Sequence, residues 1–266
     1  MNRNISASVG QGGVNRANDV KTIQDLLNAA RPTWGGPNPK LVVDGLIGPK
    51  TIGAIRQFQV HHFATVFRPD SKVDPGRRTI ERLNEVANTR EVPGASIQAH
   101  ARGSIHPLIA QPSFMTCWAT TATMLMSAHD NMSYPIDAAM DRADHNPTGN
   151  PRGYYRTLFD NNQGLPPSEV EIFAIACGMR TEPMVNFTIS RWAALIRQSG
   201  DLGVGVRMPF LHIRVIIGMY GDGTSFGTKM VVHDPDGGRR YEELFRTFLQ
   251  RYEGAAGTNN PQIFHY

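Results

Sequence analysis

The sequence predicts an α+β protein in which a small helical module precedes a larger domain of helices followed by strands. Residues 1–90 carry three amphipathic helical patterns. Residues 202–234 carry short strand-like runs, two of them separated by a turn rich in Gly and Asp. A helix-rich half followed by a meander of strands is typical of the α+β class.

Three helices are predicted in the first 90 residues. The stretch "DVKTIQDLLNAA" repeats apolar residues at helical spacing, with Asp19 as its predicted N-cap. "GPKTIGAIRQFQ" begins with Pro49, which suits a first helical turn, and "RRTIERLNEVAN" carries the same pattern. The segments "VDGLIGPKTI" and "VDPGRRTI" resemble each other, because each places Val-Asp, a Gly turn and Thr before a helix. We therefore expect residues 1–90 to form a three-helix module.

A linker is predicted over residues 91–106, because "NTREVPGASIQAHARGSIHP" has Pro, Gly and Ser but no hydrophobic periodicity. The second domain is then expected to span residues 107–266. It opens with a predicted helix from Thr116 to about Ala128. Its second half contains three strand-like runs, "LGVGVRM", "HIRVIIGMY" and "KMVVHD".

The composition fits a foldable globular chain and disfavours several classes of function. The chain has 266 residues, of which 40% are hydrophobic and 19% charged, and its net charge is +4. It has no Lys/Arg cluster with interleaved aromatics, so we expect no nucleic-acid partner. It has no apolar run of about 18 residues and no Sec-type signal peptide, so we expect no membrane span. The chain is expected to be made in the cytoplasm and to be exported, if at all, by another route.

Cys117, in "QPSFMTCW", is a candidate nucleophile. Pro112 and Ser113 break regular structure, so the predicted helix places Cys117 in its first turn. There the free amides and the helix macrodipole favour a thiolate. Gln111 can donate its side-chain amide to an oxyanion, and the backbone N–H of Cys117 can supply a second donor.

A predicted hairpin supplies the partner base. The runs "HIRVIIGMY" and "KMVVHD" flank the turn "GDGTSFG", which is centred near Thr224. If the runs pair antiparallel, His212 lies beside Asp234, within two residues of register. A carboxylate there would fix the tautomer and orientation of an imidazole base. Asp236 is the alternative acid, and His233 alternates to the strand face opposite Asp234.

Each of these residues alone also has a structural explanation. An isolated buried Cys is more often part of a core, a His at a strand start is usually half-buried, and "HDPDGG" is an ordinary turn. The consistent order of the four candidate residues favours the catalytic interpretation. Cys177 is interpreted as a core thiol, and two cysteines are too few for a disulfide framework. No HExxH or CxxC pattern is present, so neither a metal nor a cofactor is expected.

The first module resembles the peptidoglycan-binding domain-like family. The resemblance covers Val9 to Ala87 and rests on "VDGLIGPKTIGAIRQFQ", preceded by "DVKTIQDLLN", with D-G-x-x-G-P-x-T as its most specific part. The opening "SVGQGGVNRANDVKTIQDLLN" is similar to modules found on type VI secretion effectors. These resemblances imply affinity for the bacterial cell wall and export by a specialised secretion system.

The second domain resembles the papain-like cysteine peptidases, in particular the bacterial branch with bacteriocin-processing and plant-pathogen-effector enzymes. The resemblance covers residues 107–253 and rests on Gln, Cys-Trp six residues later, a following helix, and a later His and Asp. It implies that Cys117 is the nucleophile and His212 the base. It also implies that Asp234 is the orienting acid and Gln111 the oxyanion donor. Lysosomal-type enzymes have a second Cys three residues before the nucleophile. Phe114 occupies that position here, so the disulfide of that subgroup is absent.

Three functions remain open from these patterns. The first is a peptidase that acts on proteins or peptides, and the second is an amidase or endopeptidase that cleaves peptidoglycan stem peptides or cross-links. The third is a non-catalytic wall-binding or delivery protein, against which the intact set of site residues argues. Besides a substrate, the resemblance implies a component of a secretion apparatus and an immunity protein as partners. Such partners are expected for a toxin that acts in a target cell.

Overall fold

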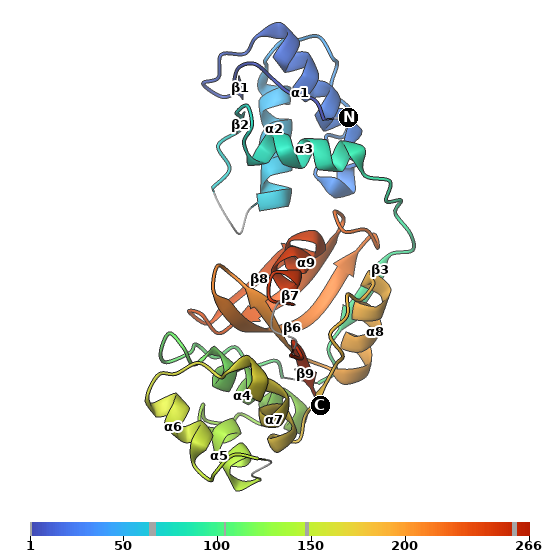
Figure 1. The fold of residues 1–266 in the computed structure, drawn as a ribbon. Helices are drawn as coiled ribbons and strands as arrows, with labels where there is room; N and C mark the ends of the chain where they lie inside the picture. Colours follow the sequence, from blue (N-terminus) through green and yellow to red (C-terminus); the bar gives the residue numbers. More distant parts are fainter. Residues whose placement is uncertain (1, 64–67, 104, 147–148, 257–259) are drawn as a thin grey trace. The chain divides into compact units, whose positions relative to one another are not determined.

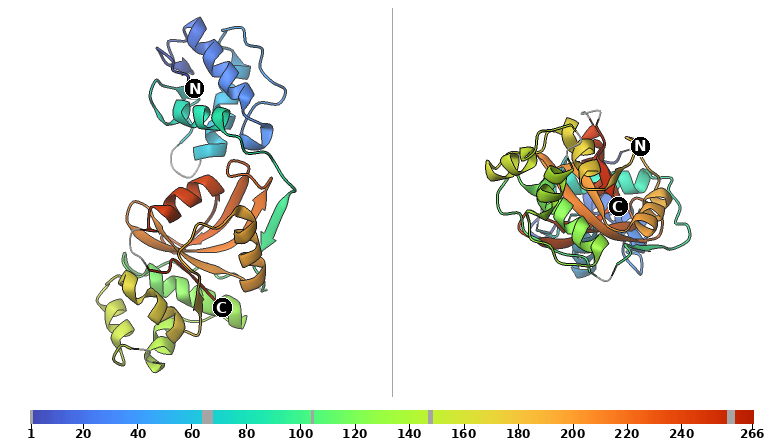
Figure 2. Two further views of the ribbon diagram at one scale, coloured as in Figure 1. Left: turned by 45° about the vertical axis from the view of Figure 1, so that its right-hand side comes forward. Right: turned by 90° about the horizontal axis from the view of Figure 1, so that it is seen from below.

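The computed structural model describes residues 2–63, 68–103, 105–146, 149–256 and 260–266 (Figure 1). Its contacts divide the chain into two compact units, Met1–Pro93 and Gly94–Tyr266. The first unit is helical with a small two-stranded ladder, and the second combines helices with a larger antiparallel sheet (Figures 1 and 2). The predicted α+β class is confirmed. In the described parts of the chain, no helix is long and apolar enough to cross a membrane.

The described part of the first unit contains three α-helices, where the hydrophobic periodicity predicts them. They are α1 (Ala17–Ala29), α2 (Pro49–Phe63) and α3 (Arg78–Asn88), with the 3₁₀ turn η1 (Pro32–Trp34) between α1 and α2. Strands β1 (Val9–Gly10) and β2 (Lys72–Val73) pair antiparallel. Each helix buries its apolar face, to which Ile23, Ile55 and Leu83 belong.

The start of α1 differs from the prediction. The helix begins at Ala17 after Arg16, so Asp19 lies inside the first turn and is not the N-cap. Its carboxylate instead accepts hydrogen bonds from the N–H and hydroxyl of Ser6 and from the N–H of Ala7. Asp19 thereby ties the N-terminal segment to α1 through a contact that the helical pattern does not reveal.

Two turns of the first unit are built alike around a buried glutamine. Each glutamine amide donates to the Asp of a turn and to the Thr of the next helix: Gln24 to Asp44 and Thr51, Gln59 to Asp70 and Thr79. The residues that follow the two aspartates, Gly45 and Ser71, both have positive φ, 79° and 60°. The structural counterpart of Asp44 is therefore Asp70. In the resemblance of "VDGLIGPKTI" to "VDPGRRTI", Asp44 corresponds to Asp74, whereas the hydrogen bond from Gln59 goes to Asp70.

A seven-stranded antiparallel sheet organises the described residues of the second unit. Its strands run in the order β4-β9-β5-β6-β7-β8, and β3 also pairs with β6. The strands are β3 (Ile97–His100), β4 (Arg180–Thr181), β5 (Leu202–Arg207), β6 (Leu211–Gly221), β7 (Thr228–Asp234), β8 (Arg239–Leu244) and β9 (Ile263–His265). The helices are α4 (Cys117–Asp130), α5 (Ala138–His145), α6 (Tyr154–Asp160), η2 (Pro167–Glu169), α7 (Val170–Ala176), α8 (Ile189–Ser199) and α9 (Phe245–Glu253).

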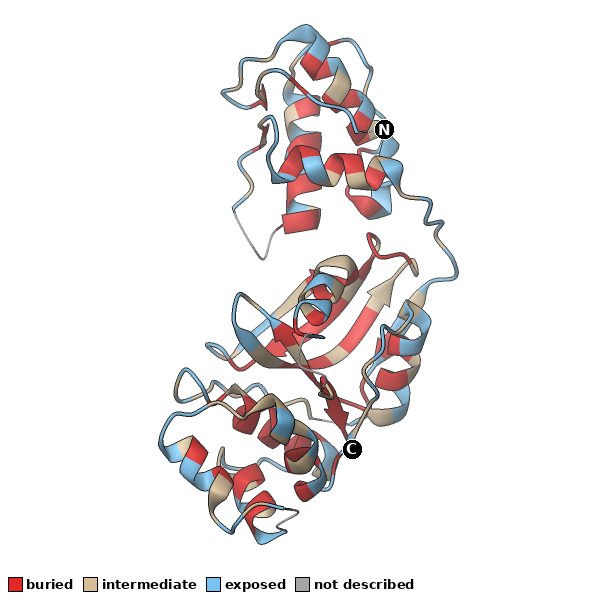
Figure 3. Cartoon of the chain, viewed as in Figure 1, coloured by how far each residue is buried: buried red, intermediate tan, exposed pale blue. Residues whose placement is uncertain are grey.

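The helices of the second unit cover the sheet as two groups. One buried cluster contains residues of α4, α5, α6 and α7 together with Val215 and Phe264 of the sheet. The other contains residues of α8 and α9 together with Ile216 and Val232 (Figures 1 and 3). Val215 and Ile216 are neighbours on β6 and face opposite sides, as alternation along a strand requires. Helix α4 is buried along most of its length, which fixes its first turn against the sheet.

The predicted linker over residues 91–106 is wrong in part. Ile97–His100 forms β3 and pairs with Gly218–Gly221 of β6. The His106 Nδ1 and Asp201 Oδ1 atoms are 2.8 Å apart, so the end of this segment also belongs to the second unit. Residue 104 of the predicted linker lies outside the described residues. A four-residue strand carries too little alternation to be recognised alone, and pairing with β6 stabilises it.

Candidate active site

Cys117 is the first residue of α4. The helix begins directly after Thr116, whose hydroxyl donates to the Ser113 carbonyl at 2.8 Å and fixes the preceding turn. The amides of the first helical turn have no acceptor within the helix, so this end favours a negative charge. Cys117 carries a free, half-buried thiol. Its predicted position in the first helical turn is confirmed.

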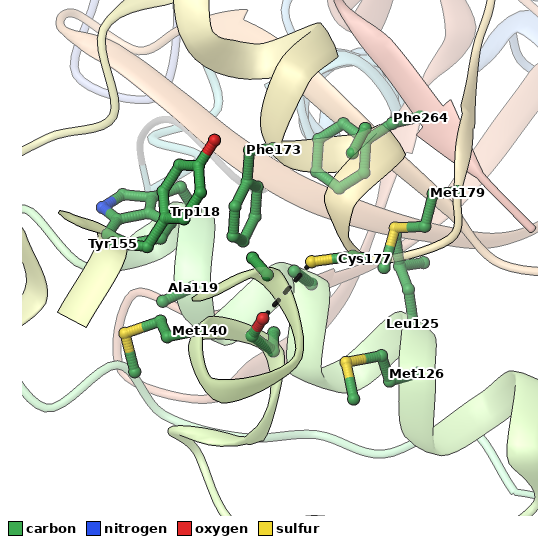
Figure 4. Close-up of a cluster of buried hydrophobic side chains, with 14 of the residues drawn as sticks. Trp118, Ala119, Leu125, Met126, Met140, Tyr155, Phe173, Cys177, Met179 and Phe264 are labelled. Atoms are coloured by element: carbon green, nitrogen blue, oxygen red, sulfur yellow. Dashed lines mark hydrogen bonds between the residues drawn. The ribbon is translucent and has the colours of Figure 1, made fainter. Parts of the chain in front are cut away.

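Trp118 anchors this helix start, which explains why a tryptophan follows the cysteine. Its side chain is buried, and its indole N–H donates to the Gln163 carbonyl at 3.1 Å. Its ring lies edge-on to Phe173 of α7, with centroids 5.1 Å apart (Figure 4). These contacts hold the backbone of the first turn, and therefore Cys117, against the α5–α7 side of the unit.

His212 and Asp234 are in contact, as the hairpin predicts. The Nε2 atom of His212 on β6 is 2.7 Å from Oδ1 of Asp234 at the end of β7. Val215 pairs with His233, a register centred on Thr224, and a bulge at Ile216–Gly218 separates this pair from the pairs nearer the turn. Asp234 is therefore a diagonal neighbour of His212 on the same face, and an imidazole can span that separation.

Two hydrogen bonds join the segment around Cys117 to the strands that carry the histidine and the aspartate. The hydroxyl of Thr121 donates to the carbonyl of Ile213, directly after the histidine, at 3.2 Å. The backbone N–H of Gln111 donates to the carbonyl of Pro235, directly after the aspartate, at 2.8 Å. The thiol, the imidazole and the carboxylate are brought together by these contacts between distant segments.

The charges in this cluster favour an ion pair. Burial lowers the pKa of His212, but hydrogen bonds with Asp234 and Cys117, together with their charges, outweigh it and raise the pKa to about 9. Burial also raises the pKa of Asp234. The hydrogen bond and charge of His212, the N–H of Asp236 and the hydroxyl of Tyr241 outweigh that effect and hold it below its ordinary value. At neutral pH His212 is therefore an imidazolium and Asp234 a carboxylate.

Gln111 lines the same cleft as Cys117. Its side-chain Nε2 donates to the carbonyls of Ser113 and Phe114, at 2.9 and 2.8 Å. Its Oε1 is buried without a hydrogen-bond partner among the described residues. The side-chain NH₂ group is thus held on the loop that leads into α4. An oxyanion can use that group only by sharing it with the two carbonyls.

A cleft of about 560 Å³ opens onto Cys117 and His212. Its lining is mainly apolar and comes from the loop before α4, the segment entering α7, β5 with its turn into β6, and the C-terminal segment that includes β9. The apolar lining residues include Phe114, Met115, Leu165, Val170, Val206, Met208, Phe210, Leu211, Pro261 and Phe264. Phe114 and Phe210 are both exposed and belong to different segments, yet their ring centroids are 6.2 Å apart. Exposed aromatic side chains around a cleft mark a binding surface.

Cys177 has the surroundings of a core residue, as predicted. It is fully buried, and its Sγ donates to the carbonyl of Ala139 at 3.4 Å (Figure 4). Burial raises the pKa of this thiol well above its ordinary value. A thiol that stays protonated and closed off from solvent cannot act as a nucleophile.

The alternative residues Asp236 and His233 make other contacts. The carboxylate of Asp236 is exposed and pairs with Arg239 at 2.7 Å, while its backbone N–H donates to Asp234. His233 lies on the opposite strand face, where its Nδ1 is 3.0 Å from the carbonyl of Pro107. Among the described residues, no group of three or more His, Cys, Asp or Glu side chains could hold a metal ion.

Two residues at the site are absent from the sequence prediction. The hydroxyl of Tyr241 donates to Oδ2 of Asp234 at 2.9 Å, and Nη1 of Arg214 donates to the Tyr241 oxygen at 2.7 Å. The charged run "RRYEEL" has no alternation that predicts β8, so Tyr241 carries no signal. Arg214 does carry a signal in the sequence. It lies two residues after His212 on a strand, so its side chain is on the same face as His212, and a buried Arg needs a partner.

A family model described as papain-like cysteine protease AvrRpt2 matches residues 102–253. The match covers more than half of the chain and includes all four predicted site residues, Gln111, Cys117, His212 and Asp234. It does not extend to the first unit. No curated protein matches the chain.

Proposed function

The chain belongs to the family of the papain-like cysteine protease AvrRpt2, and we propose that it hydrolyses peptide bonds through Cys117, His212 and Asp234. The observation that carries this proposal is the 2.7 Å contact of His212 with Asp234, in a cluster with a cysteine that opens a helix. Covalent acyl transfer requires this combination of a nucleophile, a base and a group that orients the base.

In the proposed reaction the Cys117 thiolate attacks the carbonyl carbon of the scissile amide. The backbone N–H of Cys117 and the side-chain NH₂ of Gln111 stabilise the tetrahedral oxyanion. The His212 imidazolium donates its proton to the leaving amine, and a thioester remains. His212 then takes a proton from water, which hydrolyses the thioester, and Asp234 keeps the imidazole in place throughout.

The lining of the cleft favours a protein or peptide substrate over peptidoglycan. The stem peptides of peptidoglycan carry free carboxylates, which a binding site would pair with Lys or Arg. The described lining contains neither Lys nor Arg, and it includes the acidic residues Asp234 and Asp236. Its apolar walls suit a polypeptide with bulky apolar side chains next to the cleaved bond.

The test compares two substrates for the purified full chain. We expect it to cleave a casein-type protein, to release no stem peptides from purified sacculi, and to lose all activity in Cys117→Ala. Release of stem peptides without protein cleavage would favour the amidase or endopeptidase alternative. If neither substrate is cleaved under reducing conditions, the remaining candidate is a non-catalytic wall-binding or delivery protein.

The proposal extends to the first unit, for which we infer cell-wall affinity and a part in delivery. Its support is the resemblance over Val9–Ala87 to peptidoglycan-binding modules and to modules of type VI secretion effectors. On this proposal the chain is a toxin exported by a specialised secretion system and held inactive in the producing cell by an immunity protein. Cosedimentation of the Cys117→Ala chain with purified sacculi tests the first point, and absence of binding would contradict it.

A further inference from the structure

Tyr241 of β8 contacts the Asp234 carboxylate at the oxygen that His212 does not use. We propose that Tyr241 is a positioning residue, whose hydroxyl holds Asp234 in the orientation that fixes the His212 imidazole. This inference rests on the proposed function of Cys117, His212 and Asp234, and it adds a residue that acts through the aspartate.

The carboxylate of Asp234 is held at both oxygens. Oδ1 lies 2.7 Å from His212 Nε2 and accepts the Asp236 N–H at 3.0 Å, while Oδ2 accepts the Tyr241 hydroxyl at 2.9 Å. Rotation of the carboxylate would break all of these contacts together. Without the hydroxyl, only the Oδ1 side would be held, and the carboxylate could turn away from the imidazole.

The direction of the Tyr241 hydrogen bond follows from its other neighbour. Nη1 of Arg214 is 2.7 Å from the Tyr241 oxygen, and a guanidinium can only donate. The single hydroxyl hydrogen of Tyr241 is therefore available to Asp234. A hydroxyl that accepts from a cation is also polarised into a stronger donor.

The far end of this chain of contacts is anchored in the core. The Arg214 side chain is fully buried, and its Nη1 lies 2.7 Å from Oε1 of Glu243. Glu243 is also paired with Arg251 of α9. Tyr241 and Glu243 are two residues apart on β8, as are His212 and Arg214 on β6, so all four side chains share one sheet face. The tyrosine is thus fixed by a buried ion pair and not by solvent-exposed groups.

The charged and titratable groups around Asp234 come from several elements. They are Cys117 on α4, His212 and Arg214 on β6, Asp236 in the turn, and Arg239, Tyr241 and Glu243 on β8. Burial raises the pKa of Tyr241 above its ordinary value, so its hydroxyl stays protonated and remains a donor at every pH at which the enzyme works. The Asp234 carboxylate helps to raise the pKa of His212. If the carboxylate is held less firmly, the pKa of His212 should therefore be lower than in the parent chain.

The test is Tyr241→Phe, with Tyr220→Phe as the matched control. Tyr220 lies on the same sheet, and its hydroxyl also donates to a carboxylate, that of Glu242. In Tyr241→Phe we expect kcat to fall about tenfold, the effect of one ordinary hydrogen bond, with KM unchanged. The alkaline limb of the kcat/KM profile should move to lower pH, and Tyr220→Phe should leave both unchanged.

An NMR titration of the His212 imidazole gives a second readout that needs no turnover. Its midpoint should be lower in Tyr241→Phe than in the parent chain and in Tyr220→Phe. An unchanged or raised midpoint, or an equal effect of both substitutions, would overturn the role of Tyr241. If the parent chain cleaves no substrate, the proposed function fails, while the titration still decides whether Tyr241 holds Asp234 against His212.

Discussion

Cys117 and Cys177 have the same type of side chain, but their surroundings differ in the features that control the reactivity of a thiol. Cys117 is half-buried at a helix start, and it interacts with His212 through a hydrogen bond and through charge. Cys177 is buried among the apolar residues of α4, α5 and α7, and its thiol donates to the backbone carbonyl of Ala139. Thiolate chemistry needs the first setting and is suppressed by the second.

Iodoacetamide at mildly acidic pH should therefore label Cys117 first and leave Cys177 unmodified in the folded chain. Cys117 is accessible to the reagent and lies beside the proposed base His212, whereas Cys177 is closed off from solvent. Peptide mapping by mass spectrometry identifies the modified cysteine. Cys177→Ala, the matched control, should label at the parent rate. Preferential labelling of Cys177, or equal labelling of the two thiols, would contradict the assignment.

The pH profile of the proposed peptidase should have its alkaline limb near pH 9. The pKa of His212 is raised, so the imidazolium is retained at neutral pH and is lost as the pH rises through about 9. The leaving amine then has no proton donor, and kcat/KM should fall. A limb near the ordinary value for histidine, 6.5, would mean that the contacts with Asp234 and Cys117 do not stabilise the imidazolium.

Substitutions of the base and of its acid should differ in severity. His212→Ala removes the proton carrier and should lower kcat by about a thousandfold or more. Asp234→Asn keeps the shape and should cost less, because an amide oxygen can still accept from the imidazole. Initial rates on one peptide substrate give both values. A loss in Asp234→Asn as large as in His212→Ala would mean that the negative charge, and not only the orientation, is essential.

At the scale of elements, the first unit depends on two turns that are each closed by one glutamine. Gln24 and Gln59 are both almost fully buried, and each donates to an Asp and accepts a turn N–H. Removing such a side chain leaves several buried polar groups without partners, which costs more than the hydrogen bonds contribute.

Gln59→Ala should lower the free energy of unfolding of the first unit by about 2–3 kcal/mol, because the turn after Asp70 loses its internal acceptor and donor. Gln57→Ala changes an exposed residue of the same helix and should cost about 0.5 kcal/mol. Hydrogen exchange of α1–α3 amides in the full chain measures both. Equal effects of the two substitutions would show that the turn is not closed by Gln59.

At the scale of the whole molecule, the division into two units predicts where proteolysis starts. The stretch between the end of α3 and the start of β3, residues 89–96, forms no helix or strand and is mostly exposed. The first cut should fall there and leave a fragment beginning near Gly94 that still labels at Cys117. Mass spectrometry locates the cut. A first cut within β3, or loss of labelling in the fragment, would mean that the units are not independent.

Local sequence pattern is sufficient for the elements whose contacts are near in sequence. The helices of the first unit follow from apolar spacing, and α4 begins within a residue of its predicted start. His212 meets Asp234 because one short turn joins their strands, and such a hairpin constrains both ends. The diagonal arrangement lies within the predicted two residues, but the bulge at Ile216–Gly218 leaves no sign in the pattern.

The sequence by itself determined the α+β class, the helix start at Cys117 and the contact between His212 and Asp234. Only the tertiary structure decided the strand β3 in the predicted linker, the apolar walls of the cleft and the Tyr241–Arg214 support of Asp234. The physical reason is the sequence separation of the partners. Thr121 and Ile213, which join α4 to β6, are 92 residues apart, and such contacts leave no periodic trace near either residue. They form only when burial of both faces of the sheet brings the distant segments together.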